Sequence, residues 1–191
     1  MIIGIDISQV AYSGTGVSNY LKSLVGNLIK TDTENNYILF FSSFRNKFNI
    51  SDLGLNTLPK NVKVKEFKIP PTFLGLVWNK LHIFPIENFV GKVDLFITSD
   101  WTEPPAKHAR KATFLYDLLV YKYPQEMHNK TEVNPLKLLI SPNIVSMQKR
   151  KLEWVKRETD LIFCISKATL IDAKNILEIN ESKLKVAYPG F

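Results

Sequence analysis

Short apolar runs alternate along the chain with longer segments in which apolar residues recur every three or four positions. A short run of this kind predicts a β-strand, and the longer period predicts an amphipathic helix. Strands that alternate with helices are typical of βα units, which build a largely parallel sheet. The runs expected to form strands are Ile2–Ile7, Tyr37–Ser42, Val62–Ile69, Asp94–Thr98, Ala112–Tyr116, Asp160–Ser166 and Lys185–Tyr188.

The helical segments lie between these strands. The clearest is the first, in which apolar side chains form one continuous stripe. Because several strands are apolar on both faces, helices must cover both sides of the sheet. We therefore predict an α/β fold with a doubly wound, mostly parallel sheet of about seven strands. The expected helices are Val17–Ile29, Leu74–Val90 (interrupted by Pro85), Pro135–Arg157 and Lys167–Leu177 (behind Ser166 as N-cap).

The composition is that of one globular domain. With 191 residues, 45% hydrophobic and 23% charged, the chain can bury a core but is short for two domains, so residues 1–191 are expected to form a single unit. Its one cysteine, Cys164, cannot form an internal disulfide. The N-terminus lacks the positively charged region of a signal peptide, and an acidic residue, Asp6, interrupts its apolar run. No apolar run approaches the ~20 residues that span a bilayer. These features predict a cytoplasmic protein.

The net charge of +7 favours an anionic partner. The basic stretch Lys149-Arg150-Lys151 is either a solvated helix face or a contact with an anionic membrane surface. Basic and aromatic residues do not interleave as they do in nucleic-acid-binding modules, so we expect no nucleic-acid partner. The three histidines are far apart and have no carboxylate or thiol at ligand spacing, which predicts no metal site.

A pair of glycines precedes the first predicted helix, in Gly14-Thr15-Gly16. Glycine lets the backbone turn tightly and approach a ligand, and a helix N-terminus offers unpaired N–H groups to an anion. The segment is thus a candidate phosphate-binding loop. The alternative is a simple strand-to-helix turn, because the dinucleotide fingerprint needs a third glycine where this chain has Asn19.

Tyr116 and Asp117 come at the end of a predicted strand. Ligands of open α/β sheets bind at the carboxyl ends of the strands, so this pair is a candidate for substrate binding or catalysis. The alternative is that Asp117 braces the loop after the strand, which is a common role for aspartate.

Motifs in a fixed order cover essentially the whole chain. They are Gly14-x-Gly16 with Tyr20, Asp94-x-Phe96, Pro104-Pro105, Asp117-Leu118 with Tyr123-Pro124, Asp160-x-Ile162-x-x-Ile165-Ser166-x-x-Thr169, and Val186-x-Tyr188-Pro189-Gly190. Together they resemble the N-terminal domain of glycosyltransferase family 4, the group 1 glycosyltransferases.

The resemblance implies a GT-B enzyme, in which two Rossmann-like domains face each other across a cleft. A nucleotide sugar, a GDP- or UDP-sugar, donates its sugar with retention of configuration and without a metal or other cofactor. The first domain chiefly binds the acceptor, a polysaccharide or a lipid-linked glycan, and its glycine loop faces the donor diphosphate. The candidate site residues are then Asp117 and Tyr116 (catalytic), Gly14, Thr15 and Gly16 (facing the donor phosphates), and Asn19, Tyr20 and Trp101 (on the acceptor side).

Two residues depart from the family's pattern. The family usually has His-Asp where this chain has Tyr116-Asp117, and tyrosine cannot act as an imidazole does near neutral pH. Asn19 replaces the arginine that often precedes the helix tyrosine. Each change is consistent with altered specificity or with lost activity.

The family's Val-x-Tyr-Pro-Gly strand leads into a second, donor-binding domain, whereas this chain ends one residue later, at Phe191. We therefore expect the acceptor-side half of the enzyme, with its C-terminal domain absent and supplied in cis or in trans, and inactive by itself. The leading function is that of a hexosyltransferase component at the inner face of the membrane. The competing hypothesis is a non-catalytic or degenerate module that binds a glycan or a nucleotide.

Overall fold

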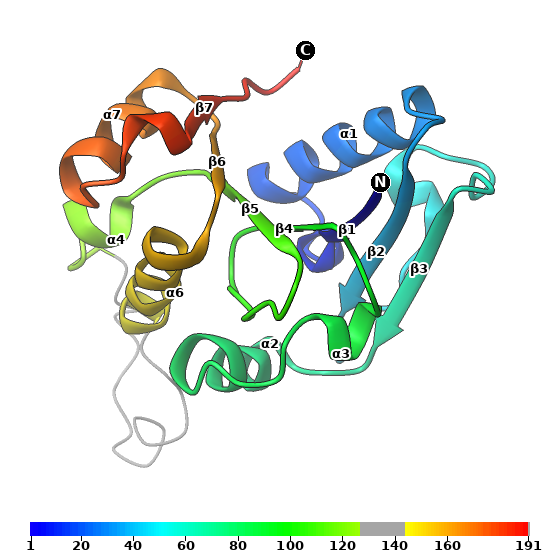
Figure 1. Ribbon diagram of the computed structural model, residues 1–191, viewed down its shortest axis with the longest axis horizontal. Coiled ribbons are helices and arrows are strands. Elements are labelled where there is room, and N and C mark those ends of the chain that lie inside the picture. Colours follow the sequence, from blue (N-terminus) through cyan, green and yellow to red (C-terminus); the bar gives the residue numbers. More distant parts are fainter. Residues whose placement is uncertain (127–143, 191) are drawn as a thin grey trace.

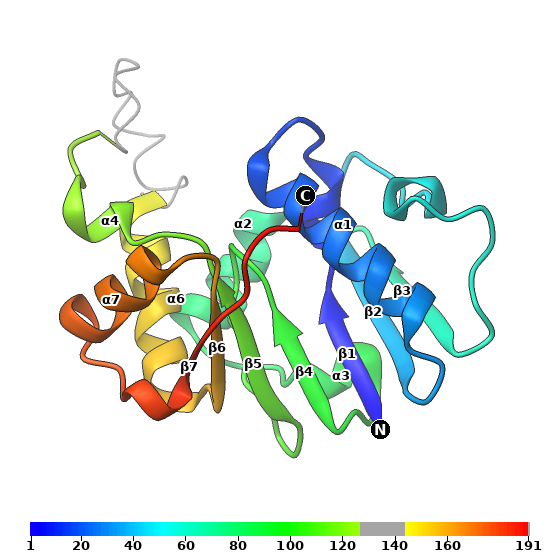
Figure 2. The same ribbon diagram turned by 90° about the horizontal axis from the view of Figure 1, so that it is seen from above.

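A computed structural model describes residues 1–126 and 144–190. Its strands form one seven-stranded sheet in the order β3-β2-β1-β4-β5-β6-β7, and every neighbouring pair is parallel. The predicted Rossmann-like, doubly wound α/β fold is confirmed (Figures 1 and 2). The strands are β1 (Ile2–Asp6), β2 (Asn36–Ser42), β3 (Val62–Phe67), β4 (Leu95–Thr98), β5 (Arg110–Leu115), β6 (Leu161–Cys164) and β7 (Leu184–Val186).

Helices cover both faces of the sheet. Figure 1 shows α1 on one face and α2 and α3 on the other, while α7 packs at the β6–β7 end. The α-helices are α1 (Gly16–Thr31), α2 (Pro71–Leu74), α3 (Glu87–Val90), α4 (Leu119–Lys122), α6 (Ile144–Glu158) and α7 (Lys167–Ile176). The other helical segments are the 3-10 helices η1 (Ser8–Ala11), η2 (Ile50–Leu53) and η4 (Glu181–Lys183), and the π-helix η3 (Gly75–Lys80).

The prediction of helix over Leu74–Val90 is wrong in its middle part. After α2 and η3 the chain leaves the helix, and it becomes helical again only in α3. Pro85 explains part of the break, because proline disfavours a helical conformation in the residue before it. His82 and Phe84 have positive φ angles of 52° and 60°. Of the helix predicted over Pro135–Arg157, residues 135–143 lie outside the described residues, and the remainder corresponds to α6.

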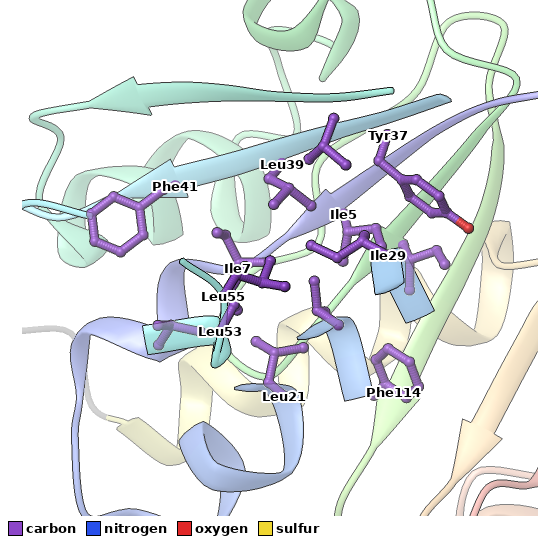
Figure 3. Close-up of a cluster of buried hydrophobic side chains, with 14 of the residues drawn as sticks. Ile5, Ile7, Leu21, Ile29, Tyr37, Leu39, Phe41, Leu53, Leu55 and Phe114 are labelled. Atoms are coloured by element: carbon purple, nitrogen blue, oxygen red, sulfur yellow. The ribbon is translucent and has the colours of Figure 1, made fainter. Parts of the chain in front are cut away.

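Strand β2 shows why the sheet needs helices on both sides. Leu39 and Phe41 belong to the core cluster that includes Leu21 of α1, whereas Phe40 belongs to a separate cluster with Trp78 of η3. Alternate side chains of a strand point to opposite faces, so consecutive apolar residues bury both. Figure 3 shows Leu39 and Phe41 on the same side of β2, facing Ile5 and Ile7 of the β1 segment.

Candidate functional site

The candidate site lies at the carboxyl edge of the sheet, where the strand order reverses between β1 and β4. Open α/β sheets bind ligands in the crevice at such a point, because the connections from the two strands leave in opposite directions. Asp6 ends β1, Asp100 follows β4 by two residues, and Tyr116 with Asp117 follows β5. All the strands are parallel, so these residues share one edge.

The glycine segment forms the turn into α1 at this edge. Gly14 has a positive φ of 87°, a conformation that other residues rarely adopt. Thr15 is the N-cap of α1, and its hydroxyl accepts a hydrogen bond from the Ser18 N–H at 3.2 Å. The N–H groups of Gly16 and Val17 have no hydrogen-bond acceptor among the described residues, as expected in a first helical turn. The turn is exposed and presents these donors outward.

A cavity of about 790 Å³ runs along α1 from this turn. Its apolar lining includes Leu24, Leu28 and Ile165, and residues 188–190 of the C-terminal segment also line it. The cavity brings together a majority of the predicted site residues but does not include Gly14, Thr15 or Trp101 among its lining. The predicted site residues that line it are Gly16, Asn19, Tyr20, Tyr116 and Asp117.

Tyr20 connects α1 to both sides of this cavity. Its hydroxyl donates a hydrogen bond to the carbonyl of Ala187 at 3.1 Å, which holds the segment after β7 near α1. Its ring makes edge-to-face contacts with Phe114 and Tyr116, with centroids 5.8 and 5.7 Å away. Tyr20 therefore shapes the wall of the cavity, and its hydroxyl already has a partner.

Tyr116 and Asp117 differ in their surroundings. Tyr116 is only 8% exposed, and burial, reinforced by the charge of Asp100, raises the pKa of its phenol well above the ordinary value. The phenol is thus protonated at neutral pH. Asp117 is exposed, and its Oδ1 accepts a hydrogen bond from the Leu119 N–H at 3.0 Å. This contact supports the bracing role, and it leaves the second carboxylate oxygen available to a ligand.

A second cavity of about 140 Å³ lies on the other side of Tyr116 and Asp117, which line both cavities. Trp101, which is 38% exposed, and Asp100 form part of its wall. Burial raises the pKa of the Asp100 carboxyl and that of Asp6. The sequence prediction missed both acids, although Asp100 closely follows a predicted strand, which is the signal that identified Asp117, and Asp6 lies near the end of another.

The basic stretch of α6 is only partly a surface feature. Lys151 is 2% exposed, and its Nζ donates a hydrogen bond to the Ser99 carbonyl at 2.9 Å. The prediction that Lys151 faces a membrane is therefore wrong, because α6 turns this residue toward the sheet. Arg150 is exposed, and Lys149 is half-buried with its Nζ 5.0 Å from the centre of the Tyr121 ring.

No described helix has the length and hydrophobicity needed to cross a membrane. Within residues 1–126 and 144–190, no three His, Cys, Asp or Glu side chains gather in a way that could hold a metal ion.

No known protein family matches the chain's sequence, and no curated protein matches it. Solved structures do match. UGT2 from Phytolacca americana, without ligand and in complex with UDP-2-fluoro-glucose and pterostilbene, is 13% identical with TM-scores of 0.53 and 0.52. The match covers 100% of this chain and 52% of UGT2.

A wall teichoic acid polymerase, TagF, is more distant, at 10% identity and a TM-score of 0.48. The chain spans about half the length of UGT2. The likeness to UGT2 shows the fold: this chain has a Rossmann-like α/β architecture, which matches one half of the UGT2 structure.

Proposed function

We propose that the chain is the acceptor-side half of a family 4 hexosyltransferase, which transfers a sugar with retention from a GDP- or UDP-sugar to a polysaccharide or lipid-linked acceptor. The observation that carries this proposal is the convergence of Gly16, Tyr116 and Asp117 on one cavity at the carboxyl edge of the sheet. A helix N-terminus and a strand-end carboxylate thus border the same space. The UDP-sugar in the UGT2 complex supports a nucleotide-sugar donor.

The donor diphosphate is proposed to lie at the Gly14–Gly16 turn. The unpaired N–H groups and the positive end of the α1 dipole favour an anion there. No Cβ or side chain blocks the approach, because a Cβ added at Gly14 or Gly16 meets nothing within 4 Å. A ligand phosphate can therefore come close to the backbone.

The chemistry is assigned to the pair after β5. The free carboxylate oxygen of Asp117 can orient an acceptor hydroxyl, and the protonated Tyr116 can donate a hydrogen bond but cannot remove a proton as an imidazole would. Since the chain covers 52% of UGT2, the remaining wall of the donor site is proposed to come from a second domain, in cis or in trans. Lys149 and Arg150 remain the candidates for contact with an anionic membrane.

We expect the 191-residue chain by itself to bind GDP- and UDP-sugars no tighter than the millimolar range, about −4 kcal/mol, and to transfer no sugar. The reason is that positioning by a facing domain provides much of the rate of such a reaction. An amide NMR titration should show shifts at Gly14, Thr15 and Gly16. Micromolar binding, transfer by the chain alone, or shifts confined to another surface would show that the donor site is misplaced.

Gly16→Val should weaken donor binding about tenfold while the unfolding temperature stays unchanged. The added side chain has room in the folded protein but stands in the path of the phosphates. The same titration measures the first effect, and calorimetry measures the second. Equal losses of binding and of stability would favour a purely structural turn.

Asp117→Asn should lower kcat about 100-fold in the protein with both domains, while the Kd of the donor is nearly unchanged. Asparagine keeps the oxygen that accepts from the Leu119 N–H, so the loop is preserved, but it removes the charge. Steady-state kinetics with donor and acceptor varied in turn measure the effect on kcat separately from the effect on donor binding. Full activity of this variant would remove Asp117 from the catalytic residues, and inactivity of the unmodified protein with every donor would favour a non-catalytic binding module.

A further inference from the structure

Several polar groups next to the smaller cavity have no hydrogen-bond partner within the described part of the chain. The hydroxyls of Ser99 and Tyr116 are both buried and unpaired. No described residue donates a hydrogen bond to the Asp100 carboxylate, although Gln148 donates one to the carbonyl of the same residue at 3.3 Å. Buried polar groups are nearly always paired in folded proteins, so a concentration of unpaired ones indicates a missing ligand or solvent.

These groups lie at the carboxyl edge of the sheet, one strand away from the point where the strand order reverses. Ser99 and Asp100 follow β4, and Tyr116 follows β5, which is the neighbouring strand. Asp100, Trp101, Tyr116 and Asp117 line the cavity of about 140 Å³. The cavity therefore lies at the edge of the sheet where open α/β folds bind their ligands.

The exposed part of Trp101 adds an apolar surface to this polar crevice. Asn79 holds its position, because the Asn79 side-chain amide donates to the Trp101 carbonyl at 2.9 Å and accepts from the Glu103 N–H at 3.0 Å. An exposed aromatic ring on a backbone that is held in place, beside hydroxyl and carboxylate groups, suits a ligand ring that has C–H bonds on its faces and hydroxyls on its rim. A pyranose has this shape and chemistry.

The charges around the cavity disfavour an anion. Asp100 and Asp117 line it, and Asp6 is close enough to affect the pKa of Tyr116. The cation in its wall, Lys151, interacts electrostatically with three carboxylates, those of Glu103, Asp100 and Asp6. A carboxylate or phosphate bound here would therefore face more carboxylates than the nearby cation can offset.

We propose that the cavity beside Trp101 binds one neutral pyranose unit of the acceptor and rejects uronic acids and sugar phosphates. The ring stacks on Trp101, and its hydroxyls pair with Asp100 and Tyr116. The site adjoins the larger cavity through Tyr116 and Asp117, so an acceptor bound here reaches the place assigned to the donor. This inference rests on the proposed function only in assigning the sugar to the acceptor.

The test is a titration of the 191-residue chain with methyl glucoside, methyl mannoside and methyl galactoside, compared with glucuronic acid, glucose 1-phosphate and glucosamine. The readout is the Trp101 indole N–H resonance, assigned with Trp101→Phe. We expect at least one neutral glycoside to bind with a millimolar Kd and to bind about tenfold more tightly than either anion. No binding of the neutral glycosides, equal binding of an anion, or tighter binding of glucosamine would overturn the proposal.

Variants separate binding from folding. Trp101→Ala should weaken binding of the neutral glycoside about tenfold. Asp100→Asn should reduce the difference in affinity between the neutral glycoside and glucuronic acid, because it removes a negative charge from the cavity. Phe73→Ala, which removes an exposed aromatic ring on α2, is the matched control and should change neither. Unchanged binding in Trp101→Ala would overturn the proposal.

The outcome also distinguishes this inference from the proposed function. If a UDP-sugar shifts the Gly14–Gly16 amides and no glycoside shifts Trp101, only the pyranose site fails. If glycosides bind and no nucleotide sugar does, the chain is a sugar-binding module and the transferase assignment fails.

Discussion

Replacing Glu103 with alanine should destabilise the protein by about 3 kcal/mol, since removing one partner of a buried ion pair leaves the other charge uncompensated. Glu103 is 0% exposed. Its Oε1 lies 2.8 Å from Lys111 Nζ, and its Oε2 accepts a hydrogen bond from the Thr98 hydroxyl at 2.6 Å. Without Glu103, the carboxylate left beside Lys111 among the described residues is that of Glu158, at 3.0 Å, and the Glu158 side chain is partly exposed.

Urea denaturation followed by circular dichroism measures this effect. The matched control is Glu181→Ala, which breaks an ion pair of 2.6 Å with Lys174 on the surface. We expect little change there, because solvent screens exposed pairs. Glu103→Gln, which keeps the shape but not the charge, should fall between the two. If the Glu103→Ala and Glu181→Ala proteins were equally stable, the buried ion pair would make no net contribution to the free energy of unfolding.

Gly26→Ala should destabilise the protein by about 2 kcal/mol, which is typical of overpacking in a core. Helix propensity alone predicts the opposite sign, since alanine is favoured over glycine in a helix interior by about 1 kcal/mol. In this fold α1 packs against η2 at Gly26, and a Cβ there would collide with the carbonyl oxygen of Leu53. A backbone atom cannot move aside as the end of a side chain can, so the helix must shift.

Gly16→Ala is the control in the same helix. A Cβ at this position meets no atom within 4 Å, so the stability should stay the same or rise slightly. Thermal unfolding of both variants tests the comparison. A Gly26→Ala protein that is as stable as the unmodified one would show that α1 and η2 separate readily.

The pattern of apolar residues determined most of the fold. All seven strands lie where the runs predicted them, within a few residues, and the helices α1 and α7 match their predicted segments. Ser166 is the N-cap of α7, and its hydroxyl accepts from the Thr169 N–H at 3.0 Å. These features depend on neighbours in the sequence, because periodicity and capping act within one element.

Local pattern also explains how far the candidate site could be predicted. Tyr116, Asp117 and Gly16 were recognisable because each lies where a strand or a helix begins or ends, and a parallel sheet places all such carboxyl ends at one edge. The part of the site beside Trp101 was only partly foreseen, because its other groups come from loops with no periodic pattern.

Only the tertiary structure decided which polar side chains are buried. The sequence places Lys151 in a basic stretch that suggests an exposed surface. In the structure, its ammonium group instead donates a hydrogen bond to the Ser99 carbonyl. The sequence places Glu103 in a segment between two strands, yet its side chain is fully buried in an ion pair with Lys111. The sequence by itself determined the strands, the first and last helices and the edge of the sheet that carries the candidate site. The pairing of distant charges depends on how helices and loops pack across the sheet, and that packing is not encoded in the period of any single segment.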